Sequence, residues 1–197
     1  MYSRVVPKLW NETIEAHRQQ VRDAILDGTA ELVFEHGLRA VTMSQVAARA
    51  GIGRATLYKY FSDVDTILRT WHARQIDTHI GELVRVRDGA GTAGERLDAV
   101  LAAYAHITRQ TRSHDRELVR FLHPDEQIRN AQEQLRAMIR QLIEEGAEAG
   151  ELRDDVPAGE LANYCLHALA GAAELGTEAA VARLVSVTMN GLHSGVR

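Results

Sequence analysis

The chain has 197 residues, a single cysteine and a formal net charge of −4 at pH 7. One thiol, Cys165, excludes an internal disulfide framework, and the sequence has neither a run of about 18 apolar residues nor the apolar core of a signal peptide. We therefore expect a soluble, cytoplasmic protein. Residues 1–60 carry eight Lys or Arg against six Asp or Glu, and the remainder carries 15 against 21. This split permits a nucleic-acid-binding protein whose basic end is the N-terminus.

Helical periodicity runs through the chain. Only three prolines occur and apolar residues recur three and four positions apart, which predicts an all-α protein of about nine helices. The first helix is expected at about 11–36, with Gly37 as its stop. Its apolar face is expected to carry Val21, Ile25, Gly28 and Leu32.

Two short helices follow, separated by a glycine turn. Thr42 and Gln45 form a capping box that starts a helix at residue 43. Gly51 can end that helix in the left-handed conformation and Ile52 can fill the turn from inside. The next helix is expected at about 54–60. Two helices this short at a steep angle suit a helix-turn-helix, in which the second helix enters a DNA groove; the alternative is an ordinary hairpin in a helical bundle.

Six more helices are expected, separated by Gly- and Pro-containing loops. The fourth runs from after Ser62 to about Arg87, the sixth is expected at about 115–122, the eighth has Pro157 in its first turn, and the ninth is expected at about 177–193. The fifth helix carries an apolar stripe of Leu97, Val100, Leu101, Tyr104 and Ile107. The seventh, at about 125–149, carries Ile128, Leu135, Met138, Ile139 and Leu142 on one face.

The last two helices are rich in Ala and Gly. Small residues let helices approach closely, and a self-complementary face of this kind makes a two-fold dimer. The alternative is a helix pair packed only within one chain.

Metal binding and catalysis find little support in the sequence. Cys165 and His167 lie about 200° apart around a helix, and His72 and His79 lie roughly 10.5 Å apart along one. No CxxC or HxxxH motif occurs, and neither does a phosphate loop or a nucleophile elbow. We expect no metal site, no cofactor and no enzymatic activity.

An ordered set of motifs resembles the N-terminal domain of the tetracycline-repressor (TetR) family over residues 19–79. The set comprises Ile25-Leu26, Leu32-Val33, Gly37, Val41-Thr42-Met43, Val46-Ala47, Ala50-Gly51-Ile52, Thr56-Leu57-Tyr58 and Phe61. The resemblance implies a helix-turn-helix at about 42–61, and residues 80–197 as a helical bundle for effector binding and dimerisation. Residues 1–18 would form an N-terminal arm and the start of the first helix, and a basic arm of this kind can lie in a DNA minor groove.

The resemblance also implies site residues. The DNA contacts would come from Thr42, Ser44, Gln45, Arg54, Ala55, Thr56, Tyr58, Lys59 and Tyr60. A ligand pocket would be lined by Trp71, His72, His79, Tyr104, Phe121, Met138 and Tyr164, unless these side chains only fill the core. A four-helix dimer interface would use Leu161, Ala168, Ala172, Val181, Leu184 and Val185.

The function implied is that of a ligand-responsive regulator, a repressor that binds a palindromic operator as a homodimer and is released by a small molecule. The alternatives are a metal-sensing regulator or an interaction adaptor that does not bind DNA. Three positions depart from the family pattern: Gly53 stands where Ser often caps the recognition helix, Val64 where Lys usually points at a phosphate, and Tyr60 where His is common.

Overall fold

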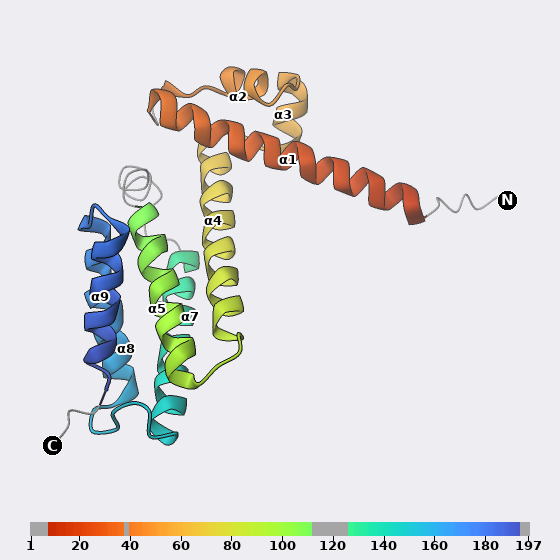
Figure 1. Cartoon of the computed structure of the whole chain (residues 1–197). Coiled ribbons are helices and arrows are strands. Elements are labelled where there is room, and N and C mark those ends of the chain that lie inside the picture. Colours follow the sequence, from red (N-terminus) through yellow and green to blue (C-terminus); the bar gives the residue numbers. More distant parts are fainter. Residues whose placement is uncertain (1–7, 38–39, 112–125, 194–197) are drawn as a thin grey trace. The chain divides into compact units, whose positions relative to one another are not determined.

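A computed structural model of the chain describes residues 8–37, 40–111 and 126–193, with side chains from residue 13 onward (Figure 1). These ranges contain eight α-helices, the 3₁₀ helix Gly171–Glu174 and no strand, so the predicted all-α fold is confirmed. The sixth helix expected at about 115–122 lies outside the described residues. The chain divides into two compact units, Met1–Arg74 and Gln75–Arg197.

The first unit starts with the long helix α1, Lys8–His36. It begins three residues before the predicted start and ends as predicted at Gly37, whose φ of 81° is left-handed. The predicted inward face is largely confirmed, because Ile25, Gly28 and Leu32 are buried. Residues 13–20 at the other end of the helix are all exposed.

Helices α2, Met43–Arg49, and α3, Arg54–Tyr60, begin and end where the sequence predicts. Both are seven residues long, and isolated helices shorter than about 12–15 residues are marginal in water. Packing must therefore hold them in place. The apolar core of the first unit consists of Ile25, Leu26, Leu32, Val41, Val46, Ala47, Leu57, Phe61 and Ile67.

Helix α4, Val64–Arg87, contains the boundary between the two units. Its start is capped by Asp63, whose Oδ1 accepts the backbone N–H of Thr66 at 2.7 Å. The hydrogen bonds from Ser62 and from Thr66 hold the pKa of the Asp63 carboxyl below its ordinary value. Both predicted ends of this helix are confirmed.

The second unit contains α5, Ala93–Gln110, α7, Glu126–Glu148, α8, Ala158–Ala170, and α9, Glu178–Asn190. These four helices lie side by side (Figure 1). The predicted stripes of α5 and α7 face inward and meet residues of α8 and α9 in one apolar core. Its fully buried members include Leu97, Val100, Leu101, Ile139, Leu142, Ile143, Leu169 and Val181.

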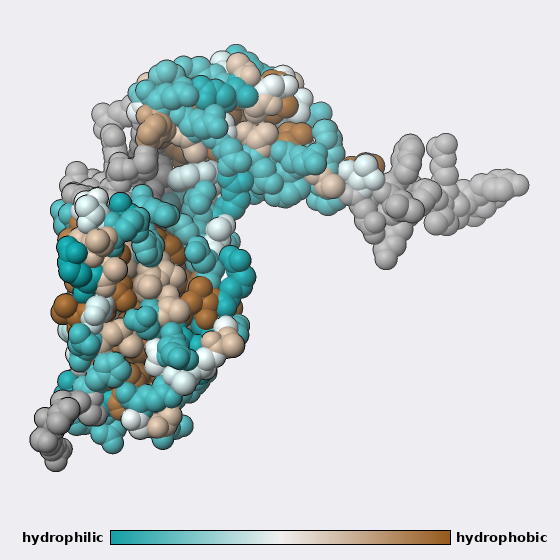
Figure 2. Space-filling model, viewed as in Figure 1, coloured by the Kyte–Doolittle hydropathy of each residue, from teal (hydrophilic) through white to brown (hydrophobic). Residues whose placement is uncertain are grey.

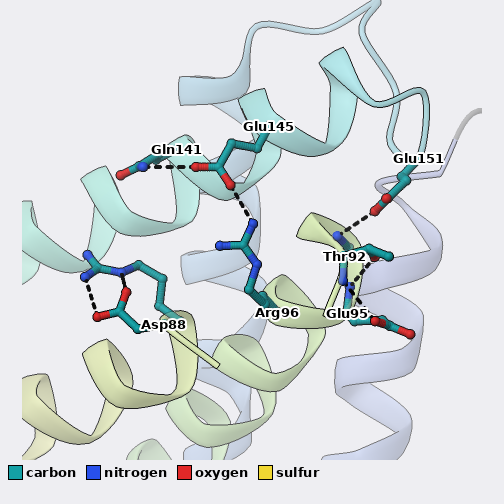
Figure 3. Close-up of polar contacts among 9 residues, drawn as sticks. Asp88, Thr92, Glu95, Arg96, Gln141, Glu145 and Glu151 are labelled. Carbon is teal, nitrogen blue, oxygen red and sulfur yellow. Dashed lines mark hydrogen bonds and ion pairs between the residues drawn. The ribbon is translucent and has the colours of Figure 1, made fainter. Parts of the chain in front are cut away.

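Polar contacts in the second unit gather at helix ends (Figure 3). Thr92 and Glu95 form a capping box at the start of α5. The Glu151 carboxylate accepts the backbone N–H of Gly94 at 2.8 Å, and Arg96 donates to Glu145 at 2.6 Å. These bonds satisfy free helix termini and join α5 to the end of α7.

Three details of the second unit differ from prediction, the first being that α9 ends at Asn190, before the expected residue 193. Pro157 is the N-cap of α8 and not a residue of its first turn, so the helix starts at Ala158. After α8 the chain tightens into an unpredicted 3₁₀ helix, η2, Gly171–Glu174. Such tightening is common where an α-helix ends, because i→i+3 bonds satisfy the last carbonyls.

Hydrophobic residues are interspersed with polar ones over the second unit in the view of Figure 2. Two of its large apolar side chains are exposed: Tyr164 on α8 by 41% and Val187 on α9 by 64%. No helix in the described ranges combines the length and apolar composition needed to span a bilayer.

Candidate nucleic-acid interface

The candidate interface begins at the capping box of α2. The backbone N–H of Thr42 donates to Gln45 Oε1 at 2.9 Å, and the Gln45 N–H donates to Thr42 Oγ1 at 3.4 Å. Both residues and Ser44 are exposed. The predicted capping box is confirmed, and it places three polar side chains at the N-terminal end of α2.

The turn between α2 and α3 depends on Gly51, whose φ of 66° lies in the left-handed region. Ile52 then returns to the core of the first unit, and its N–H donates to the Ala47 carbonyl at 3.0 Å. Gly53 is the N-cap of α3 but offers no side-chain hydrogen bond. The turn is thus fixed by backbone geometry and by one apolar side chain.

Helix α3 presents nearly all of its surface to solvent. Leu57 is its single buried residue and anchors it to the core. Arg54, Ala55, Thr56, Tyr58 and Lys59 are exposed, and Tyr58 exposes 50% of its surface. Tyr60 is half-buried and packs against the core, so it has less surface for a DNA contact than the other predicted residues.

The charge of this region is of one sign. Residues 40–60 contain no Asp or Glu, and their cations are Arg49, Arg54 and Lys59. Arginine and lysine can bind phosphates or guanine edges, and Thr can contact either base edges or phosphates. An exposed, acid-free helix with these side chains has the chemistry of a DNA-reading element.

Three arginines of the first unit make contacts that the sequence reading did not identify. Arg49 of α2 bonds Glu31 and Glu35 of α1. Arg74 of α4 bonds Asp23 and Asp27 of α1. The Arg22 guanidinium lies 5.1 Å from the centroid of the Phe61 ring, as a cation–π pair.

The sequence gives a partial signal for the first two contacts, because each pair of acids is spaced four residues apart on α1. It does not say which arginine they meet. The hydrogen bonds from Arg49 hold the pKa of the Glu35 carboxyl below its ordinary value.

The predicted pocket residues divide between the units. Trp71 and His72 belong to the first unit, where Trp71 packs against the core. In the second unit Met138 is buried in the core, Tyr104 packs against it and His79 is half-buried. A side chain placed at Gly191 would lie 2.8 Å from the Tyr164 hydroxyl, so Tyr164 lies against the end of α9. Phe121 lies outside the described residues.

Most of the predicted dimer residues are buried in the apolar core of the second unit. Leu161, Ala172, Val181 and Val185 are buried in its core, whereas Ala168 and Leu184 are half-buried. The small and apolar side chains of α8 and α9 therefore pack largely within one chain. A partner subunit would have to contact the outer sides of the same helices.

Within the described residues, no group of three or more His, Cys, Asp or Glu side chains is placed to hold a metal ion. Burial raises the pKa of the Cys165 thiol to about 12. The thiol therefore stays protonated and has the character of a core residue.

Family comparisons agree with this geometry. Residues 25–69 match the profile described as "Bacterial regulatory proteins, tetR family", and residues 98–194 match that of the "Transcriptional regulator SbtR-like, C-terminal domain". The fold and the exposed helix define a helix-turn-helix transcriptional regulator. The chain belongs to the TetR family.

Individual relatives match only part of the chain. The HTH-type transcriptional regulator BetI of Serratia proteamaculans is 32% identical over 84 residues, which are 41% of this chain and 42% of that protein. The chain thus spans less than half the length of this relative. The fatty acid metabolism regulator protein of Bacillus subtilis is 23% identical over 141 residues, 66% of this chain and 70% of that protein.

Solved structures of similar fold extend over most of the chain. A TetR/AcrR-family regulator from Thermobifida fusca aligns with a TM-score of 0.75 at 21% identity, covering 86% of this chain and 97% of that one. FadR from Bacillus subtilis, solved with stearoyl-CoA, aligns with a TM-score of 0.66 at 17% identity and covers 86% and 98%.

Proposed function

We propose that the protein is a transcriptional repressor that binds a near-palindromic operator in the bacterial cytoplasm as a homodimer. The observation that carries the proposal is α3: an exposed, acid-free helix whose buried Leu57 leaves Arg54, Tyr58 and Lys59 directed to solvent. Two copies would read half-sites about one DNA turn, 34–36 Å, apart.

The homodimer would form through the outer sides of α8 and α9. Tyr164 and Val187 are large, exposed and located on these two helices. Exposed apolar side chains on neighbouring helices are what a second copy with the same surface can cover.

A small molecule bound to the second unit would release the operator. Thr188 is the single buried polar residue among the described part of that unit, and its hydroxyl already donates to the Leu184 carbonyl at 2.8 Å. An interior of this composition favours an apolar ligand. In support, FadR of Bacillus subtilis was solved with stearoyl-CoA and another regulator of similar fold, SmeT, with triclosan.

Helix α4 would carry the signal, because its residues belong to both units. A ligand that binds more tightly to the protein with α4 in one placement shifts the population of molecules toward that conformation. The free energy of DNA binding then changes by the same coupling free energy.

The test is a gel shift with genomic fragments, followed by titration of a retained fragment. The double variant Tyr58→Ala/Lys59→Ala is expected to stay folded and to lose specific binding. Arg136→Ala, which removes one exposed cation from α7 of the second unit, is the matched control and should bind as the wild type does. Retained specific binding by the double variant would remove α3 from the interface.

The same titration, repeated at several salt concentrations, measures how the DNA affinity depends on salt. Affinity should fall steeply between 50 and 200 mM salt if several phosphates are neutralised, roughly 10³-fold for about six contacts. A flat response would contradict an electrostatic interface.

A further inference from the structure

Arg49 occupies the last turn of α2, directly before the turn that leads into α3. Its Nη1 donates to Glu31 Oε2 at 3.0 Å and to Glu35 Oε1 at 3.1 Å, and its Nη2 donates to Glu35 Oε2 at 2.6 Å. The two acids stand one helical turn apart on α1, so both carboxylates face the same guanidinium. The Glu35 contact is the planar two-bond pairing that Arg makes and Lys cannot.

The stem of Arg49 lies across Gly28 of α1. A Cβ added at Gly28 would lie 2.8 Å from Arg49 Cγ, closer than real Cβ atoms come to a neighbour. Glycine inside a helix costs about 1 kcal/mol relative to Ala, yet Gly28 is buried in the middle of α1. The close approach of α1 and α2 explains why glycine stands there.

The orientation of α3 depends on that of α2. Helix α2 buries only Val46 and Ala47, and α3 buries only Leu57. Met43, Ala50 and Tyr60 add only partly buried contacts with the core, so few apolar contacts set the rotation of each helix about its axis. The Arg49 contact adds a directional restraint at the end of α2 that adjoins α3.

We propose that Arg49 is a positioning residue, which fixes α2 against α1 and thereby sets the angle of the recognition helix, and is not a cation for DNA phosphate. This inference rests on the proposed DNA binding. Arg49 stands in the same acid-free segment as Arg54 and Lys59, so composition alone would count it with them. Its three hydrogen bonds to carboxylates assign it the other role.

The two roles predict effects of opposite sign for Glu35→Gln. If Arg49 bound phosphate, removing a neighbouring negative charge would release it and strengthen DNA binding. If Arg49 positions α2, the same change weakens specific binding despite the more favourable net charge. Glu15→Gln is the matched control, since Glu15 is an exposed acid of the same helix, 3.7 Å from Arg18.

The experiment titrates the full-length wild type, Glu35→Gln, Glu15→Gln and Arg49→Lys against a retained genomic fragment and against random-sequence DNA. Glu35→Gln and Arg49→Lys are expected to weaken specific binding about tenfold, the size of losing one base contact, and to leave binding to random DNA unchanged. Loss of folded protein would weaken both kinds of binding equally, so the ratio separates positioning from destabilisation. Arg49→Lys keeps the charge and most of the stem, which provides a second variant if Glu35→Gln does not fold.

The last measurement is the salt dependence of DNA binding by Arg49→Gln. The slope of log affinity against log salt should equal that of the wild type, whereas loss of a phosphate contact would reduce it by about one. A reduced slope, or specific binding by Glu35→Gln that equals or exceeds that of Glu15→Gln, overturns the positioning role while DNA binding itself stands. A wild type that binds no fragment specifically overturns both proposals.

Discussion

The two units hold their helices together by different means. In the first unit Arg49 and Arg74 each join a helix to a pair of acids on α1, and two of the helices are only seven residues long. In the second unit helices of 13 to 23 residues pack through continuous apolar stripes. Its ion pairs between helices, such as Arg96–Glu145, lie near helix ends.

Helix length explains the difference for α2 but not for Arg74, which lies on the 24-residue helix α4. A short helix such as α2 buries little apolar surface, so the directional ionic contact of Arg49 adds to the packing that holds it. A long amphipathic helix is oriented by its stripe, and charges then only close its ends. Substitutions in the first unit should therefore change DNA affinity as well as stability, and substitutions in the second unit should change stability and assembly.

The largest expected effect concerns assembly of the second unit. Val187→Glu places a charge on the outer side of α9, where we propose that a second copy packs. The dissociation constant of the dimer should rise by roughly 100-fold, because an unpaired charge would be buried in the interface. Sedimentation velocity over a range of concentrations measures it. Ile14→Glu, a comparable change at an exposed position of α1, should leave the dissociation constant of the dimer unchanged. Equal dissociation constants for the two variants would mean that Val187 does not lie in the dimer interface.

An intermediate effect, on the free energy of unfolding, is expected from a substitution near the end of α7. A Cβ at Gly146 would lie 2.6 Å from Leu152 Cδ1 and 2.8 Å from Leu152 Cγ, and Leu152 is itself buried. Gly146→Ala should therefore destabilise the protein by about 1–3 kcal/mol through overpacking. Urea denaturation gives the free energy of unfolding.

Gly81→Ala is the matched control for this substitution. Gly81 is an exposed residue inside α4 with no atom within 4 Å of an added Cβ. The same change there should stabilise the protein by up to about 1 kcal/mol through helix propensity. Destabilisation of similar size at both positions would mean that the packing around Gly146 is not tight.

The smallest effect compares the two capping boxes, one in each unit. Thr42→Ala and Thr92→Ala each remove the side-chain cap of a helix and should each lower stability by about 1 kcal/mol. Only Thr42→Ala should also weaken operator binding, by roughly tenfold, because only Thr42 adjoins the proposed interface. Thermal melting and the gel shift together measure the pair, and Thr→Ser at either position should restore the cap. An equal loss of DNA affinity in both variants would reduce the role of Thr42 to helix stability.

Local signals explain which parts of the fold could be predicted. The ends of α2 and α3 follow from a capping box, a glycine turn and a short apolar pattern, all within 20 residues, and they are correct. The exposed side of α3 could be predicted equally well, because Arg and Lys side chains are seldom buried without partners.

Contacts between distant segments could not be predicted in the same way. Leu161 and Val185 suit a dimer interface and a core equally well by composition, and they lie in the core. Arg49 meets acids 14 and 18 positions away, and nothing in the sequence distinguishes it from the cations of α3. In both cases the deciding fact is which helix faces which, and tertiary packing sets it.

The buried thiol of Cys165 has a practical consequence. Because it is the chain's one cysteine, lies at 0% exposure and has a pKa near 12, maleimide reagents should leave the native protein unlabelled. The Ala55→Cys variant could then carry one spin label per subunit on α3, and Cys165 would not have to be replaced first. In the proposed homodimer, paired labels would report the distance between the two α3 helices directly, with and without an added apolar ligand.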